Sequence, residues 1–135
     1  MPTWNKNPES LARGAAIVLS GTYVGEWHTI KGAANLAFYT RMTSAGSPKL
    51  AVSIDYSIFE PGETIIPPDN AYQTVSLIAA HTTVWNGTAG AGTFTYTACP
   101  AEILNGAVSI RVRAVESNGV AVTAFDQFMT KTTRS

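Results

Sequence analysis

Apolar and polar residues alternate along most of the chain with a period of two. In the run 50–58 the even-numbered positions are Leu, Val, Ile, Tyr and Ile, and in the run 108–114 they are Val, Ile, Val and Ala. A weaker alternation occupies residues 36–41 and 93–97. Because successive side chains of a strand point to opposite faces, each run predicts a strand with one buried face.

Short turn sequences rich in Gly, Asn, Ser and Pro separate these runs. About eight strands result, which favours the all-β fold class, as a single antiparallel β-sandwich or jelly-roll-like domain. Asn118 and Gly119 between the last two runs predict a hairpin, since Asn-Gly supplies the positive φ of a tight turn. The predicted strands cover residues 14–19, 22–30, 34–42, 49–59, 73–85, 93–97, 107–116 and 120–130.

The sequence predicts little helix. One helical turn fits residues 9–13, and another fits residues 100–104, which begin with a proline. Residues 1–13 are mostly polar and predict an extended N-terminal arm in front of a β-sandwich domain over residues 14–135. Trp4 in this arm is either a clasp onto its own domain or an anchor into a neighbouring subunit.

Residues 60–70 form a polar stretch that its prolines stiffen. Ile65 and Ile66 lie in the middle of this stretch, where leaving them in water is costly. Two interpretations stay open. Either the pair is a contact knob for a partner, or the stretch folds back over one end of the sandwich as a lid.

Composition narrows the classes of function. Hydrophobic residues make up 45 % of the 135 residues, enough for a core, whereas charged residues make up only 13 %. The usual charged share is about 25 %. Nine basic and nine acidic side chains cancel, which argues against binding to nucleic acid through phosphates. No apolar run approaches the roughly 20 residues of a membrane span, and the first residues lack a signal-peptide pattern.

The low charge favours assembly with other protein subunits. A surface rich in Thr, Ala and Gly loses little solvation when a partner covers it, and large permanent interfaces are depleted in charge. The charged residues are unevenly distributed along the sequence. Residues 50–110 hold five acidic side chains and no basic one. This separation predicts attraction between oppositely charged parts of neighbouring copies.

Arg111 and Arg113 lie two residues apart and therefore on one face of a predicted strand. They form either a solvated edge or ion pairs with carboxylates of a neighbouring subunit. In the second case, replacing both by Ser weakens assembly at low salt and leaves the melting of the isolated fold almost unchanged. The candidate carboxylates are Glu60, Glu63 and Asp69.

Candidate catalytic and metal-binding residues are few. His28 and His81 each lie inside a predicted strand, without a Gly-x-Ser-x-Gly elbow or a metal-ligand spacing. Asp55 and the acids of residues 60–70 suggest a glycosidase pair or a calcium site, but their spacing favours a solvated loop. Cys99 is the single cysteine and predicts a buried structural thiol. The sequence therefore predicts no catalytic residue, no cofactor and no metal site.

Aromatic residues support an alternative class of function. Tryptophans and tyrosines on a β-sandwich can form a flat platform on which sugar rings stack. A carbohydrate-binding module that uses Trp27 or Trp85 is the alternative that follows. The tyrosines available to such a platform are Tyr23, Tyr39, Tyr56, Tyr72 and Tyr96.

The layout of residues 15–21, 36–40, 50–57 and 108–114 resembles the successive strands of small virion proteins of tailed bacteriophages. The resemblance implies a β-sandwich with a leading arm that decorates or cements a capsid, often as a trimer. It also implies the major capsid protein as partner and a place on the capsid surface of the virion, after synthesis in the host cytoplasm. Phage tail and head-completion proteins share the same low-charge composition.

The first functional hypothesis is therefore a non-enzymatic structural protein that binds the assembled phage capsid and stabilises it by bridging capsomers. It predicts a homo-oligomer with neither nucleic acid nor membrane as a partner. A carbohydrate-binding module or another phage structural protein is the alternative. A hydrolase that uses His28 or His81 with an acid is the most distant hypothesis.

Overall fold

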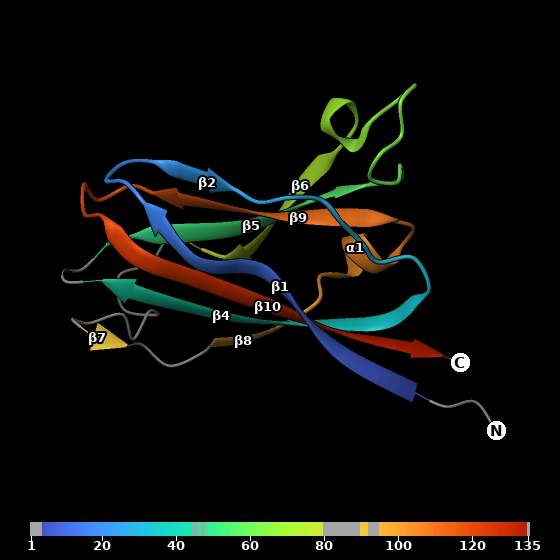
Figure 1. The fold of residues 1–135 in the computed structure, drawn as a ribbon, viewed down its shortest axis with the longest axis horizontal. Coiled ribbons are helices and arrows are strands. Elements are labelled where there is room, and N and C mark those ends of the chain that lie inside the picture. Colours follow the sequence, from blue (N-terminus) through green and yellow to red (C-terminus); the bar gives the residue numbers. More distant parts are fainter. Residues whose placement is uncertain (1–3, 45, 47, 80–89, 92–94, 135) are drawn as a thin grey trace.

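Two antiparallel sheets pack face to face and form a β-sandwich (Figure 1). The computed structural model describes residues 4–44, 46, 48–79, 90–91 and 95–134. Each of the two sheets has five strands. The predicted fold class, an all-β antiparallel sandwich, is confirmed.

The first sheet contains β1 (Trp4–Ile17), β4 (Ala33–Ser44), β7 (Gly90–Ala91), β8 (Thr95–Ala98) and β10 (Val122–Arg134). Strand β10 lies between β1 and β4, and the short strands β7 and β8 both pair with β4. All these pairings are antiparallel. The start of β1 and the end of β10 therefore lie side by side, as Figure 1 shows at its lower right.

The second sheet contains β2 (Thr22–Val24), β3 (His28–Thr29), β5 (Leu50–Ser57), β6 (Gln73–Ile78) and β9 (Ser109–Glu116). Strand β9 pairs with β5 on one side and with β2 and β3 on the other, and β6 pairs with the far side of β5. Two short helices complete the described chain, the 3-10 helix η1 (Pro68–Asn70) and α1 (Ala101–Leu104). None of the described helices is long and apolar enough to span a membrane.

The alternation of apolar residues identifies the core correctly. The apolar even-numbered positions of β5 up to Ile54, and those of β9, are fully buried between the sheets. Large side chains of β4 and β10 meet them from the first sheet. These are Phe38, Met42, Phe125 and Met129.

The N-terminal segment is part of the first sheet in this structure. It pairs with β10 from Trp4, opposite Arg134, as far as Ile17. The predicted helical turn over residues 9–13 is wrong, because a single turn gains few hydrogen bonds whereas a strand beside β10 pairs along its length. The division into an arm over residues 1–13 and a separate domain stays a prediction.

Gly14 shows why this strand follows β10 irregularly. The pairing register shifts repeatedly between Ser10 and Ile17, and Gly14 has a φ of 60°, which favours glycine. The Gly14 N–H donates to Oδ1 of Asp126 on β10 at 2.8 Å. A side chain on the neighbouring strand therefore satisfies a backbone donor that the bulge removes from the ladder.

Strands β9 and β10 do not form the predicted hairpin. They belong to different sheets, so residues 117–121 carry the chain from the second sheet to the first. Gly119 has the expected positive φ of 70°. Asn118 has no positive φ, so the pair does not form the tight turn of a hairpin, and residues 117–121 instead pass between the two sheets that cover the core.

The other predicted elements agree with the structure in part. The run 22–30 is divided into β2 and β3, and residues 25–27 lie between them, although the Gly25 N–H still donates to the carbonyl of Val112 on β9 at 2.9 Å. Strand β6 ends at Ile78, and residues 80–85 of its predicted run lie outside the described residues. The helical turn over residues 100–104 is confirmed as α1.

Glu116 organises the corner where β9 ends. Its carboxylate is almost fully buried and accepts backbone N–H groups from three connections of the chain. Oε1 accepts from Ser20 at 2.9 Å and from Val120 at 3.0 Å, and Oε2 accepts from Lys49 at 3.1 Å and from Asn118 at 2.7 Å. Burial alone would raise the pKa of Glu116, but these four backbone donors lower it to about 2.

The substitution Glu116→Gln tests this corner. We expect it to lower the free energy of unfolding by about 1–3 kcal/mol at neutral pH, because an amide offers one acceptor oxygen where the carboxylate offers two. Chemical denaturation followed by tryptophan fluorescence measures the change. Glu102→Gln, on the exposed side of α1, is the matched control and should leave the unfolding free energy unchanged.

Glu116 also predicts the acid sensitivity of the fold. Its folded-state pKa lies below its ordinary value of 4.5, so its contribution is complete above that value and is lost as the pH falls toward about 2. In Glu116→Gln this part of the pH dependence should disappear. An unfolding free energy equal to that of the wild type at both ends of this pH range would contradict the account.

Candidate interaction surface

Asp55, Arg111 and Arg113 form an ion cluster on the outer face of the second sheet. Asp55 lies opposite Arg111 in the register of β5 and β9, and Ser53 lies opposite Arg113. Their neighbours Ile54 and Val112 point into the core, so the charged side chains point away from it. The Asp55 side chain is nevertheless completely buried.

Three side chains donate hydrogen bonds to the Asp55 carboxylate. Nε of Arg111 lies 2.8 Å from Oδ2, Nη2 of Arg113 lies 3.0 Å from the same oxygen, and Oγ1 of Thr74 lies 2.7 Å from Oδ1. Burial alone would raise the pKa of Asp55. The hydrogen bonds from Arg113, Arg111 and Thr74 instead hold it below its ordinary value, so the group is ionised at neutral pH.

Arg111 also binds the connection between β5 and β6. Its Nη1 lies 2.6 Å from Oδ1 of Asp69, and the indole Nε1 of Trp27 donates to the same oxygen at 2.8 Å. The guanidinium carbon lies 4.5 Å from the ring centroid of Trp27 and 4.8 Å from that of Tyr72. Both rings attract the cation through their faces. Arg111 thus joins β9 to two surface connections.

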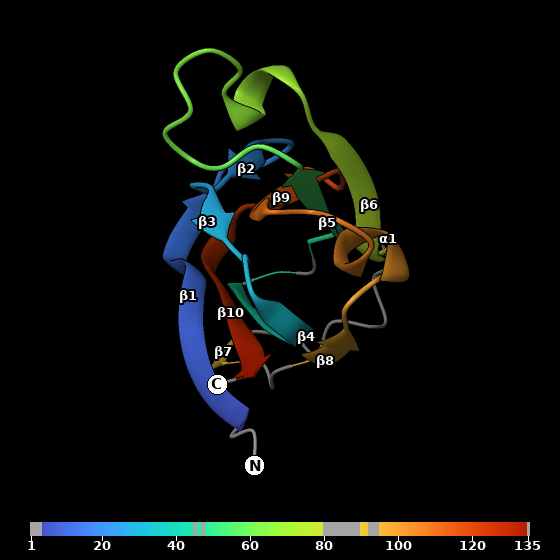
Figure 2. The same ribbon diagram turned by 90° about the vertical axis from the view of Figure 1, so that its right-hand side faces the viewer.

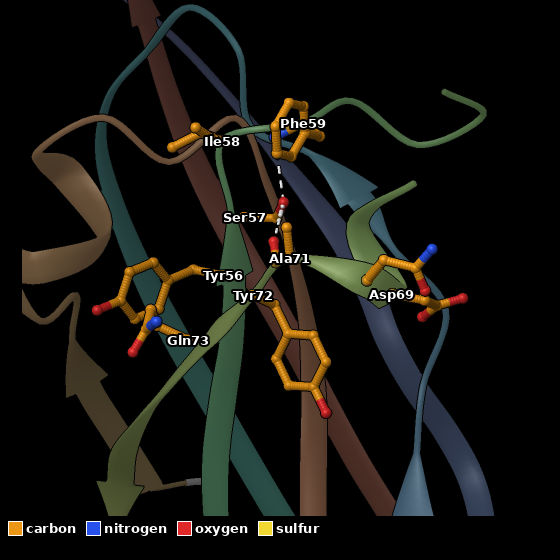
Figure 3. A pocket seen from close by; sticks show the side chains of 9 residues that line it. Tyr56, Ser57, Ile58, Phe59, Asp69, Ala71, Tyr72 and Gln73 are labelled. Atoms are coloured by element: carbon orange, nitrogen blue, oxygen red, sulfur yellow. Dashed lines mark hydrogen bonds between the residues drawn. The ribbon is translucent and has the colours of Figure 1, made fainter. Parts of the chain in front are cut away.

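The ends of the β5–β6 connection are fixed by two serines. Oγ of Ser57 donates to the carbonyl of Ala71 at 2.7 Å and accepts the N–H of Phe59 at 3.1 Å, as Figure 3 shows. Oγ of Ser109 donates to the carbonyl of Phe59 at 2.7 Å. An open hollow of about 490 Å³ lies beside these contacts, between the two ends of the connection.

The middle of this connection stands away from the sandwich. Figure 2 shows residues 58–72, in green, rising beyond the second sheet. Ile65 is 88 % exposed and Ile66 is 42 % exposed. Of the two interpretations left open by the sequence, the structure therefore has the geometry of a projecting knob and not that of a lid.

The two candidate interface arginines, which were expected to pair with carboxylates of a neighbouring subunit, form ion pairs within this chain. Both arginines pair with carboxylates of their own chain, Asp55 and Asp69. Glu60 lies 3.2 Å from Lys31, and Glu63 is exposed. For the isolated fold we now predict destabilisation on loss of both arginines instead of indifference, because Asp55 would be left buried without a cationic partner.

An interface role for these residues and for Trp4, at the start of β1, stays a prediction. The sequence analysis missed the contributions of Trp27, Tyr72 and Thr74. The signal available was that Asp55 and both arginines occupy the polar, outward positions of their strands. The register that brings them together follows only from the packing of the core.

The described residues offer little for catalysis. His28 Nδ1 lies 3.5 Å from Glu9 Oε2, a contact between the two sheets, and Lys131 Nζ lies 3.4 Å from the other oxygen of Glu9. Burial and the charge of Glu102 raise the pKa of Cys99 to about 11, so its thiol is protonated at neutral pH. Within the described ranges no group of three His, Cys, Asp or Glu could hold a metal ion. His81 and Trp85 lie outside those ranges.

Comparisons with known proteins show the fold. No protein-family model and no curated protein matches the sequence. The crystal structure of the infectious bursal disease virus VP2 subviral particle matches with a TM-score of 0.60 and 14 % identity, over 95 % of this chain and 32 % of that chain. The structure of the Gx strain of the same virus gives a TM-score of 0.61 at 14 % identity, with the same coverage. The structure of tobacco necrosis virus matches with a TM-score of 0.48 and 12 % identity, over 99 % of this chain and 95 % of that chain.

This chain thus has an antiparallel β-sandwich similar to part of the matched chains of the infectious bursal disease virus VP2 subviral particle and of the Gx strain. It spans about a third of the length of these two virus chains. The likeness covers nearly all of this chain, so the two-sheet arrangement as a whole is shared and not a single hairpin.

The double variant Arg111→Ser/Arg113→Ser tests the ion cluster. We expect the free energy of unfolding to fall by about 3–5 kcal/mol, because a buried carboxylate loses its cationic partners. Adding Asp55→Asn should restore part of the loss, since the neutral amide needs no counter-ion. Urea denaturation measures all three proteins.

Arg13→Ser on β1 is the matched control, because that arginine is exposed. It should leave the urea midpoint unchanged. A double variant that unfolds at the wild-type midpoint would show that the cluster does not stabilise the fold.

Proposed function

We propose that this chain is a non-enzymatic structural virion protein. In this proposal it binds an assembled phage capsid, stabilises it by bridging capsomers, and so acts as a decoration or cement protein. The partner is the major capsid protein, and the place of action is the capsid surface. The sandwich similar to part of VP2 supports a structural role in a virion, and the low share of charged residues, 13 %, supports extensive contact with other subunits.

The exposure of Ile65 on an anchored connection is the observation that carries the proposal. A solvent-exposed isoleucine gains about 1.5–3 kcal/mol when a partner buries it completely. Because Arg111 and two serines already hold the flanking residues, binding pays little for ordering this segment. Binding that occurs only on the assembled lattice stabilises the lattice by mass action.

A carbohydrate-binding function through Trp27 has weaker support. Arg111 lies 4.5 Å from the centroid of the Trp27 ring, and the indole N–H donates to Asp69. The aromatic surface and the hydrogen-bond donor that a sugar would use are therefore engaged within the protein.

Localisation on particles tests the proposed function. We expect antibodies against this chain to label the outer surface of intact capsids, and particles lacking the chain to lose their genome at a lower temperature. Labelling confined to the tail or to the head–tail junction would support a tail or head-completion protein instead. Absence from purified particles would overturn the proposal.

The double variant Ile65→Ser/Ile66→Ser tests the contact itself. We expect it to weaken binding to capsids by at least about tenfold, which corresponds to loss of about 1.4 kcal/mol of apolar contact. Co-sedimentation of the purified chain with capsids measures the affinity. The unfolding midpoint should change little, because Ile65 is 88 % exposed and neither isoleucine belongs to the core cluster or to the hydrophobic residues packed against it.

Leu104→Ser on α1 is the matched control, because Leu104 is 41 % exposed and lies outside the β5–β6 connection. It should bind capsids as the wild type does. Equal loss of binding in both variants would show that general surface hydrophobicity, and not this connection, mediates attachment.

A further inference from the structure

The outer face of the first sheet carries a row of aromatic side chains. Phe128 of β10 lies opposite Tyr39 of β4, and Tyr39 lies opposite Tyr96 of β8. The rings of Tyr39 and Tyr96 meet edge to face, with centroids 5.3 Å apart. Tyr39 is 39 % exposed and Tyr96 is 59 % exposed, although the flanking residues Phe38 and Thr40 are buried in the core.

A small hollow lies beside the two tyrosines. Its volume is about 190 Å³. Ala37 and Thr130 lie opposite one another in the register, and Asn35 and Thr132 form the next outward pair along the same strands. The hollow is lined by Asn35, Leu36, Ala37, Tyr39, Tyr96, Thr130 and Thr132.

The lining carries no charged side chain, which defines the class of ligand. A phosphate, a nucleotide or an acidic sugar would find no counter-ion there. The polar groups are neutral hydroxyls and an amide. The Asn35 Oδ1 accepts the N–H of Leu36 at 2.9 Å, so the amide nitrogen remains as a donor beside the two threonine hydroxyls.

We propose that this hollow binds one neutral pyranose ring of a glycan. The C–H groups of a sugar ring pack against aromatic rings, and its hydroxyl groups exchange hydrogen bonds with Asn35, Thr130 and Thr132. The volume is below the range of about 300–1,000 Å³ that holds drug-sized ligands, which fits a single ring. Tyr39 and Tyr96 are two of the tyrosines that the sequence made available to an aromatic platform, but this site lies on the first sheet and does not include Trp27.

A second copy of the chain fits this face less well than a sugar does. A stable protein interface covers about 800 Å² on each partner and has an apolar centre. On the described outer face of the first sheet, the large exposed apolar side chains are Tyr39 and Tyr96, and the residues around the hollow are small or polar.

A single site of this size gives weak binding, with a dissociation constant in the millimolar range. Many copies on one particle would raise the apparent affinity by multivalency. The multivalency depends on the proposed virion function, whereas the site does not, so the first test uses the isolated chain.

Nuclear magnetic resonance titration of the isolated chain tests the proposal. The probes are the methyl pyranosides of glucose, galactose, mannose and N-acetylglucosamine. We expect at least one of them to shift the backbone amide signals of Ala37, Tyr39, Tyr96 and Thr130. Tyr96→Ala and Tyr39→Ala should each reduce the shifts at least tenfold at a given sugar concentration, and Tyr96→Phe should keep them.

Tyr72→Phe on the second sheet is the control and should titrate as the wild type does. If no neutral sugar shifts these amides at saturating solubility, the proposal is overturned. It is also overturned if Tyr96→Ala binds normally, or if this face instead mediates self-association that Tyr96→Ala abolishes in sedimentation. None of these three results bears on the capsid contact of Ile65, so the two proposals fail separately.

Discussion

The ion cluster around Asp55 is the interaction on which the outer surface of the second sheet depends. A completely buried carboxylate is costly unless cations and hydrogen-bond donors compensate it, and Arg111, Arg113 and Thr74 do so. Because Arg111 is also bound by Asp69 and lies beside the rings of Trp27 and Tyr72, the connections that carry these residues have a defined place on the sheet. The same residues therefore stabilise the fold and position its most exposed apolar segment.

A second buried carboxylate, Glu116, fixes the connections of the chain at the end of β9. Its four backbone donors come from three connections, so one side chain determines how the chain passes between the sheets. A chain with only 13 % charged residues thus buries three of its acids, Asp55, Glu116 and Asp126. Fewer charges remain for the surface, and that leaves broad neutral faces such as the one with Tyr39 and Tyr96.

The sequence predicted the strands and the core, because a period of two specifies which positions are buried before any pairing is known. The prediction from sequence failed where contacts between distant residues decide which strands pair. The segment over residues 4–13 pairs with β10, and β9 and β10 separate into different sheets despite the Asn-Gly sequence between them. The pairing of Asp55 with Arg111 depends on the register of strands 56 residues apart, which no local pattern contains.

Amide hydrogen exchange along residues 58–72 tests the central claim, that Arg111 holds the segment which presents Ile65. In the wild type the N–H groups of Asn70 and Ala71 donate to Pro67 and Pro68, at 3.0 and 3.1 Å. The account predicts that Arg111→Leu, in which Arg113 still pairs with Asp55, loses protection at these two amides but keeps it at Ile54 in the core. Unchanged protection of Asn70 and Ala71 in Arg111→Leu would contradict it.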